Sequence, residues 1–114
     1  MMSGKSPGLR MTLATQLVLR AMLAEPTREM YGLQICQAAE LPSGTIHPIL
    51  ARLERLGWLE SHWEDAAPQV EGRPRRRYYR LTEDGAERAR IALAQATTSA
   101  AALSLHPRAA GGLA

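Results

Sequence analysis

Apolar residues recur along this chain at helical spacing, and their pattern divides it into successive elements. Residues 9–24 are apolar on most sides with a single polar line, which is typical of a helix at the centre of a core or between subunits. After a Glu-Pro-Thr break, residues 30–40 predict a second, shorter helix with Tyr31, Ile35 and Ala39 on one side. Both helices are expected to contribute to one hydrophobic core.

The stretch 41–58 predicts a third helix whose outer face carries small residues and cations. Its apolar stripe consists of Ile46, Ile49, Leu50, Leu53 and Leu56. About half a turn away lie Gly44, His47, Pro48, Ala51 and Arg55, with Arg52 on the flank. Short side chains let the backbone approach another molecule closely, and long cations can reach phosphates or a guanine edge. We expect this helix to begin close to Thr45, capped by Ser43 or Thr45, and to stop at Gly57.

The second helix, the break at residues 41–44 and the third helix together indicate a helix-turn-helix. In such a motif the third helix would be the recognition helix. Taken alone, residues 41–58 are also compatible with an ordinary surface helix that has one solvent-exposed face. The interpretation therefore depends on the neighbouring segments of the chain. The residues that we expect to contact the major groove and its phosphates are Ser43, Thr45, His47, Arg52 and Arg55.

A β-hairpin is predicted directly after the third helix. Residues 58–64 alternate loosely with period two, residues 65–74 are rich in Pro, Gly and charge, and residues 77–81 are again strand-like. A hairpin in this position is a wing, whose arginines would lie along a phosphate backbone or enter the minor groove. The predicted wing contacts are Arg73, Arg75, Arg76 and Arg77. Alternatively, this is a solvated turn whose arginines only maintain solubility. Tyr78 and Tyr79 are expected to brace the hairpin rather than touch bases.

The last predicted helix carries a heptad-like seam of mostly small residues. Thr82 caps it, and Glu83 and Asp84 in its first turn favour the helix dipole. The seam consists of Ala86, Ala89, Leu93, Ala96, Ala100 and Leu103. We expect it to be buried against a second copy of the chain, alongside Leu13 and Leu17 of the first helix. The alternative is that the helix folds back onto its own domain.

These elements predict a fold that is mainly α with a small β-hairpin: a winged helix-turn-helix domain followed by a dimerisation helix. The predicted boundaries are a flexible arm at 1–8, the DNA-binding domain at 9–82, the dimerisation helix at 83–105 and a disordered tail at 106–114. A chain of 114 residues accommodates one domain with its own core.

Charge and composition narrow the function further. The formal net charge of +3 and the pI of about 9.6 are only mildly basic, so the clustering of arginines matters more than their sum. No uninterrupted apolar run is long enough to span a membrane and no secretory signal is evident, so we expect a cytoplasmic protein. The single Cys36 cannot form an intrachain disulfide and is interpreted as a small core residue.

The sequence contains no recognisable catalytic or metal-binding constellation. Its histidines lie in unrelated contexts, and no nucleophile, base and orienting residue can be assembled. No glycine loop that would cradle a phosphate is present either. We therefore expect neither an enzyme nor a bound cofactor.

Several motifs together resemble the PadR family of bacterial winged-helix transcription regulators. They are Tyr31-Gly32 with Ile35, the run from Gly44 to Leu50, Arg52-Leu53-Glu54, Gly57, the run from Gly72 to Arg75, the run from Arg77 to Thr82, and Gly85. The resemblance covers roughly residues 9–103, and it is the combination that is specific. The single helix after the wing is similar to the short subclass, in which that helix builds the dimer interface.

The resemblance implies a homodimeric repressor of its own or a neighbouring promoter, which binds a pseudo-palindromic operator and is released by a small-molecule effector. Two departures limit what it implies. The family motif usually has Tyr where this chain has His47, and the last helix lacks the aromatic residues on which some short-subclass members stack flat ligands.

The resulting hypothesis is that two subunits present their third helices to successive major grooves about 34 Å apart, while the wings contact the flanking backbone. Two alternatives remain open at this stage. One is a winged helix used only for protein–protein contact, because fold does not fix function. The other is an architectural DNA binder that responds to no effector.

Overall fold

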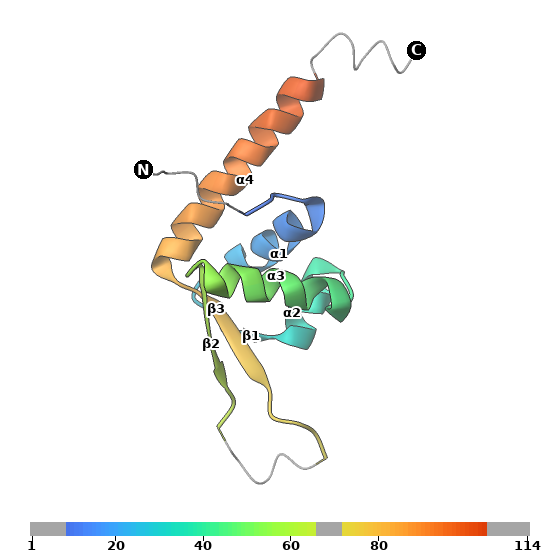
Figure 1. Ribbon diagram of the computed structural model, residues 1–114, viewed down its shortest axis with the longest axis vertical. Coiled ribbons are helices and arrows are strands. Elements are labelled where there is room, and N and C mark those ends of the chain that lie inside the picture. Colours follow the sequence, from blue (N-terminus) through green and yellow to red (C-terminus); the bar gives the residue numbers. More distant parts are fainter. Residues whose placement is uncertain (1–8, 66–71, 105–114) are drawn as a thin grey trace.

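The computed structural model describes residues 9–65 and 72–104, with side chains as far as residue 97. The elements are, in chain order, α1 (Leu13–Leu23), β1 (Met30–Tyr31), α2 (Gly32–Ala39), α3 (Ser43–Arg55), β2 (Leu59–Trp63), β3 (Arg77–Leu81) and α4 (Glu83–Ser104). The arm predicted for 1–8 and the tail predicted for 106–114 lie outside the described residues. In Figure 1, α3 crosses the front of the helical core, and the β2–β3 hairpin and α4 extend from it in opposite directions.

Helix α1 begins later than its apolar pattern predicted. The side chain of Thr12 accepts a hydrogen bond from the backbone N–H of Thr15 at 3.1 Å, which makes Thr12 the N-cap. The hydroxyl of Thr12 also donates to that of Thr15 at 3.0 Å, so this buried polar side chain is satisfied. Leu9 and Met11 still pack against the core. Apolar residues both before and after Thr12 therefore pack against the core, and the apolar pattern is longer than the helix itself.

The small sheet contains a third strand that the sequence did not predict. Met30 and Tyr31 were expected to begin a helix, but they form β1, which pairs antiparallel with β3. The strand order is β1-β3-β2, with Met30 opposite Tyr79 and Tyr31 opposite Tyr78. A strand of two residues has no periodicity, and its partner lies far along the chain, so local pattern could not identify it. The mainly α fold with a small antiparallel sheet is confirmed.

Helix α3 starts two residues earlier than predicted. Its N-cap is Pro42, and no side chain caps it, so the expected capping role of Ser43 or Thr45 was wrong. Pro48 consequently lies inside the helix and cannot donate to the carbonyl of Gly44. The other end agrees with the prediction, because Gly57 adopts a φ of +81° just beyond the helix.

The core lies between α1, α2, α3 and the sheet, and the first turns of α4 close it. The large side chains that are fully buried are Val18, Leu19, Ile35, Ile46, Leu50 and Leu53. Leu56, the last member of the predicted stripe, is instead 37% exposed, because it follows the final turn of α3.

Helix α4 has a different role in its first half from the one predicted. Ala86, Ala89 and Leu93 are buried in the chain's own core, where α4 packs against α1 and β3. This corrects the prediction that they form a seam against a second copy, because a side chain already buried within one chain is not available to another. Ala96 is half-buried, and the side chains of Ala100 and Leu103 lie outside the described residues.

Candidate nucleic-acid interface

The outer face of α3 is open to solvent along its whole length. Its exposed residues are Ser43, Gly44, His47, Pro48, Ala51, Arg52 and Arg55. Thr45, which the sequence placed among the groove contacts, is half-buried. A methyl group added to Gly44 would meet nothing within 4 Å, so the backbone at this end of the helix is accessible. A helix with such a face has the shape and the donors needed to enter a major groove about 12 Å wide.

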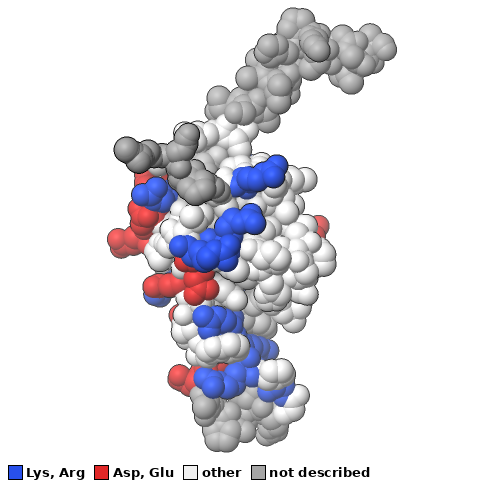
Figure 2. All heavy atoms as spheres, in the orientation of Figure 1, with Lys and Arg blue, Asp and Glu red and all other residues white. Residues whose placement is uncertain are grey.

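The cations of this face are not neutralised within the chain. Among the described residues, Arg52 and Arg55 form no ion pair, whereas Glu54 between them pairs with Arg77 of the wing. Figure 2 shows Lys and Arg side chains gathered over this face and along the wing, with most acidic side chains toward one edge. Unpaired guanidinium groups retain their full charge for phosphate contacts.

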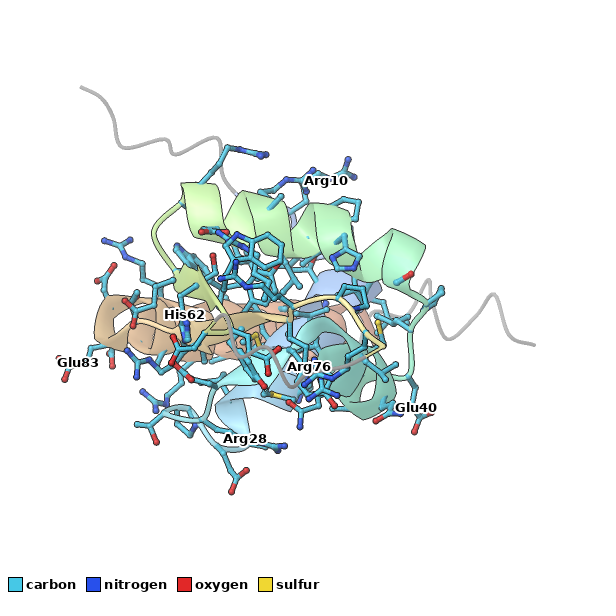
Figure 3. The ribbon with its side chains drawn as sticks, turned by 90° about the horizontal axis from the view of Figure 1, so that it is seen from below. Arg10, Arg28, Glu40, His62, Arg76 and Glu83 are labelled. Carbon is cyan, nitrogen blue, oxygen red and sulfur yellow. The ribbon has the colours of Figure 1, made fainter. Side chains whose placement is uncertain are left out.

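The structure adds one cation that the sequence did not place with the recognition helix. Arg10 precedes α1, and its side chain is exposed and lies on the side of the molecule that carries α3 (Figure 3). Arg28 lies on the opposite side in the same view. No local pattern could have found this, because Arg10 precedes α1 and reaches the face through the packing of that helix.

The arginines at the outer end of the wing, just before β3, are organised by one residue, Glu64. Glu64 accepts hydrogen bonds from Nη1 and Nη2 of Arg73 at 3.0 and 3.1 Å and from the backbone N–H of Arg76 at 3.0 Å. Its backbone carbonyl accepts from Nε of Arg75 at 2.9 Å. Arg73 and the Arg76 N–H hold the pKa of Glu64 below its ordinary value. Arg73, a predicted phosphate contact, therefore already has an intrachain partner.

The next two arginines lie on opposite faces of the hairpin, as successive strand residues must. The guanidinium carbon of Arg76 lies 4.0 Å from the ring centre of Tyr31, on the face turned away from α3. Arg77 turns toward α3, where its Nη2 is 3.6 Å from a carboxylate oxygen of Glu54. The predicted wing contacts therefore do not form one stripe, and the guanidinium groups of Arg75 and Arg76 are the ones without an acidic partner in the described part of the chain.

Aromatic rings stiffen the hairpin on both of its faces. Tyr79 is 8% exposed and belongs to the core, and burial raises the pKa of its phenol. Tyr78 meets Tyr31 edge to face with ring centres 5.6 Å apart and stacks with His62 at 5.8 Å. Each ring thus packs within the chain, which supports the expectation that the two tyrosines brace the hairpin.

His62 connects the wing to the loop before β1. Its Nε2 lies 2.8 Å from a carboxylate oxygen of Glu29, and its Nδ1 lies 3.1 Å from the carbonyl of Trp63. The hydrogen bond to Glu29, followed by that to Trp63, raises the pKa of His62 above its ordinary 6.5. The stabilisation from this pair is complete below pH 6.5 and is lost as the pH rises through the raised pKa.

Glu29→Gln is expected to lower the pKa of His62 toward its ordinary value, because the main cause of the shift is removed. The ring-proton resonances of His62, followed by NMR from pH 5 to 9, measure this directly. Glu60→Gln serves as the control, since Glu60 lies on the same strand but pairs with Arg80. Equal titration of His62 in the wild type and in Glu29→Gln would contradict the expectation.

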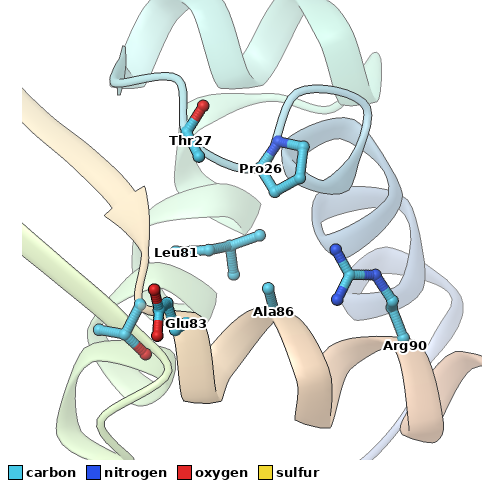
Figure 4. A pocket seen from close by; sticks show the side chains of 7 residues that line it. Pro26, Thr27, Leu81, Glu83, Ala86 and Arg90 are labelled. Carbon is cyan, nitrogen blue, oxygen red and sulfur yellow. The ribbon is translucent and has the colours of Figure 1, made fainter.

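A pocket of about 210 Å³ lies where the loop after α1 meets the junction of β3 and α4. Its residues are Pro26, Thr27, Leu81, Thr82, Glu83, Ala86 and Arg90. Figure 4 shows Leu81 and Ala86 at its floor and the guanidinium of Arg90 at its side. At this volume the pocket can hold only a small ligand, and its lining residues come from both the wing strand β3 and α4.

Residues 9–65 and 72–104 were also searched for metal-binding groups and for helices that could cross a membrane. No group of three or more His, Cys, Asp or Glu side chains is arranged there to hold a metal ion, and Cys36 is half-buried on α2. None of the helices in the same residues has the length and apolar character needed to cross a membrane.

Comparison with protein families identifies residues 19–91 as a match to the Transcriptional regulator PadR-like family. Comparison with curated protein sequences gave no match. The matched span includes α1 from its seventh residue, the sheet, α2, α3 and the first turns of α4. It therefore includes every residue placed above on the outer face of α3 and on the wing.

Solved structures share the fold. A PadR family transcription regulator from hypervirulent Clostridium difficile R20291 is 21% identical, with 82% of this chain and 96% of that chain covered and a TM-score of 0.63. Overoxidized AbfR bound to DNA is 24% identical, with 79% and 60% covered and a TM-score of 0.59. Bordetella bronchiseptica BpsR, whose DNA binding is regulated by 6-hydroxynicotinic acid, is 19% identical, with 95% and 77% covered and a TM-score of 0.59.

Proposed function

Because the chain belongs to the PadR-like family of transcriptional regulators, we propose that it is a sequence-specific binder of double-stranded DNA that represses its own or a neighbouring promoter. The observation that carries the proposal is the open face of α3, on which Arg52 and Arg55 have no acidic partner within the described chain. In the proposed complex α3 enters the major groove, and the wing lies along the flanking backbone.

We propose further that the active form is a homodimer. Leu13 on α1 is 70% exposed and Ile91 on α4 is 49% exposed, so each of these helices presents a large apolar side chain that a second copy could cover. Helix α4 also continues for three turns beyond its last core residue, Leu93. A second copy packed there would present two α3 helices to successive major grooves about 34 Å apart, which requires a pseudo-palindromic operator.

The test is electrophoretic mobility shift of the purified protein on the DNA upstream of its own coding sequence, titrated in salt. A scrambled duplex of equal length is run beside it, and sedimentation of the free protein gives its oligomeric state. We expect selective retardation of the upstream duplex that weakens steeply with salt, because phosphate contacts release counterions. Equal retardation of both duplexes would instead favour an architectural role, and retardation of neither at low salt would favour a protein-interaction role.

A small-molecule effector is part of the proposal. Its support is the pocket between the wing strand and α4, where a ligand in contact with Leu81, Ala86 and Arg90 would touch both elements. The BpsR structure offers an analogy, since a small aromatic acid regulates DNA binding by that protein. Small organic acids can be tested in the same retardation assay, in which an effector reduces the retarded fraction at constant salt.

A further inference from the structure

The side chain of Glu54 is an acidic group on α3 itself, among the proposed DNA-binding cations. It lies in the last turn of α3 between the exposed Arg52 and Arg55, and 37% of its side chain is exposed. A carboxylate at this position would repel phosphates if it were simply solvated. The contacts of Glu54 within the chain give a structural reason for an acidic residue at this position.

Glu54 connects α3 with both strands of the wing. The hydroxyl of Ser61 on β2 donates a hydrogen bond to Oε2 of Glu54 at 2.6 Å, and Nη2 of Arg77 on β3 lies 3.6 Å from the same oxygen. Ser61 and Arg77 point to the α3 side of the hairpin, as Leu59 and Tyr79 do. Among the described residues, the side-chain polar links between α3 and the hairpin all end on this one carboxylate.

Trp63 completes the arrangement at the outer end of β2. It is the cross-strand partner of Arg77, whose guanidinium carbon lies 5.1 Å from the centre of its ring. The indole is 54% exposed, and its ring is the aromatic face beside the guanidinium of Arg77. Arg77 is thereby held between a carboxylate and an aromatic face, which restrains a side chain that would otherwise be mobile.

This link matters at the outer end of the hairpin, because β1 pairs with β3 only at Tyr78 and Tyr79 and the ladder beyond them has two strands. The outer part of a two-stranded ribbon is only marginally stable and twists easily without support. Of the core residues of β2 and β3, Leu59 and Leu81 lie at the base of the hairpin and Tyr79 lies in its middle, so none lies at the outer end. A wing that swings relative to α3 cannot bring its arginines to the backbone while α3 occupies the groove.

We propose that Glu54 is a positioning residue for DNA binding, which holds the wing at a fixed angle to α3 through Ser61 and Arg77. It touches no DNA itself. Arg77 neutralises the negative charge of Glu54, so this charge does not weaken the attraction of the neighbouring cations for phosphate. The role of Glu54 is to let α3 and the wing contact the DNA at the same time. The inference rests on the proposed DNA binding, and it identifies Glu54 as the residue that couples α3 with the wing.

The test compares Glu54→Ala with Glu87→Ala, an exposed acid on α4, so that both variants gain the same charge. Glu54→Ala is expected to weaken operator binding roughly tenfold and to reduce the salt slope by about one unit, because wing contacts are lost. Glu87→Ala should bind as the wild type does. If Glu54 were only a local negative charge, its removal would strengthen binding, so operator affinity equal to or above the wild-type value would overturn the proposal.

Ser61→Ala breaks the same link without changing any charge, and is expected to weaken binding in the same direction. Combined with Glu54→Ala it should add little, since both variants remove one shared connection. Additive losses would indicate separate, unrelated destabilisation. Thermal melting of each variant establishes that it is folded at the assay temperature.

A second measurement needs no DNA. Spin labels at Ala51→Cys on α3 and Pro74→Cys on the wing, in a Cys36→Ser background, report the distance between the two elements. Glu54→Ala is expected to broaden that distance distribution, and an unchanged distribution would overturn the proposal. If the wild type retards no duplex but this distribution broadens, the proposed function fails while the link itself stands.

Discussion

Gly85→Ala is expected to lower the free energy of unfolding by about 3 kcal/mol, because the added methyl group has no space. A Cβ at Gly85 would lie 2.6 Å from the carbonyl carbon of Trp58 and closer still to its oxygen. That backbone cannot easily move away, since the carbonyl of Trp58 accepts a hydrogen bond from the N–H of Thr82 at 3.0 Å. The melting temperature should fall by roughly 10 °C or more, measured by circular dichroism.

Gly44→Ala is the matched control for this substitution. Gly44 is also in the first turn of a helix, but a Cβ there would meet nothing within 4 Å. Alanine favours the helix by up to about 1 kcal/mol over glycine, so this variant should melt at or above the wild-type temperature. Similar losses in the two variants would show that helix starts in general, rather than the approach to Trp58, determine the cost.

The double variant Arg52→Ala/Arg55→Ala is expected to weaken operator binding roughly 100-fold and to reduce the salt slope by about two units, one for each lost phosphate contact. Both side chains are exposed on α3 and have no acidic partner among the described residues. Their removal should therefore leave the melting temperature nearly unchanged. The measurement is the mobility-shift titration at several salt concentrations.

Arg28→Ala/Arg88→Ala provides the control with the same change in net charge. Each of these arginines is exposed and pairs locally, Arg28 with Glu25 at 3.3 Å and Arg88 with Asp84 at 2.7 Å. Because Arg28 lies on the side opposite α3, the control should keep the wild-type salt slope (Figure 3). If both double variants lost affinity equally, net charge rather than the face of α3 would account for binding.

The site residues were predictable from the sequence where their exposure follows from helical periodicity. The stripe of Ile46, Ile49, Leu50 and Leu53 is buried, so the opposite face of α3, with its small residues and arginines, must be open. The roles of the wing arginines were not predictable in this way. Whether Arg73 meets Glu64 depends on how the two strands of the hairpin pair, and whether Arg77 meets Glu54 depends on how the hairpin lies against α3. No local pattern encodes either.

The same division applies to the glycines of the family motif. Gly57 was predictable, because a helix that stops needs a residue with positive φ, and it adopts +81°. Gly85 was not, because an acidic helix start gives no reason for a glycine at that place. Its reason is the backbone of Trp58, which the pairing of β2 with β3 brings close to the start of α4.

By itself the sequence determined four helices, a β-hairpin, the open face of α3 and membership of the PadR family, since each depends on periodicity, caps or motifs within a short stretch. The tertiary structure alone decided the rest. It assigned Met30 and Tyr31 to a third strand, took Ala86, Ala89 and Leu93 into the chain's own core, and joined α3 to the wing at Glu54. These features depend on contacts between residues far apart in the chain, where burial and pairing override local propensity.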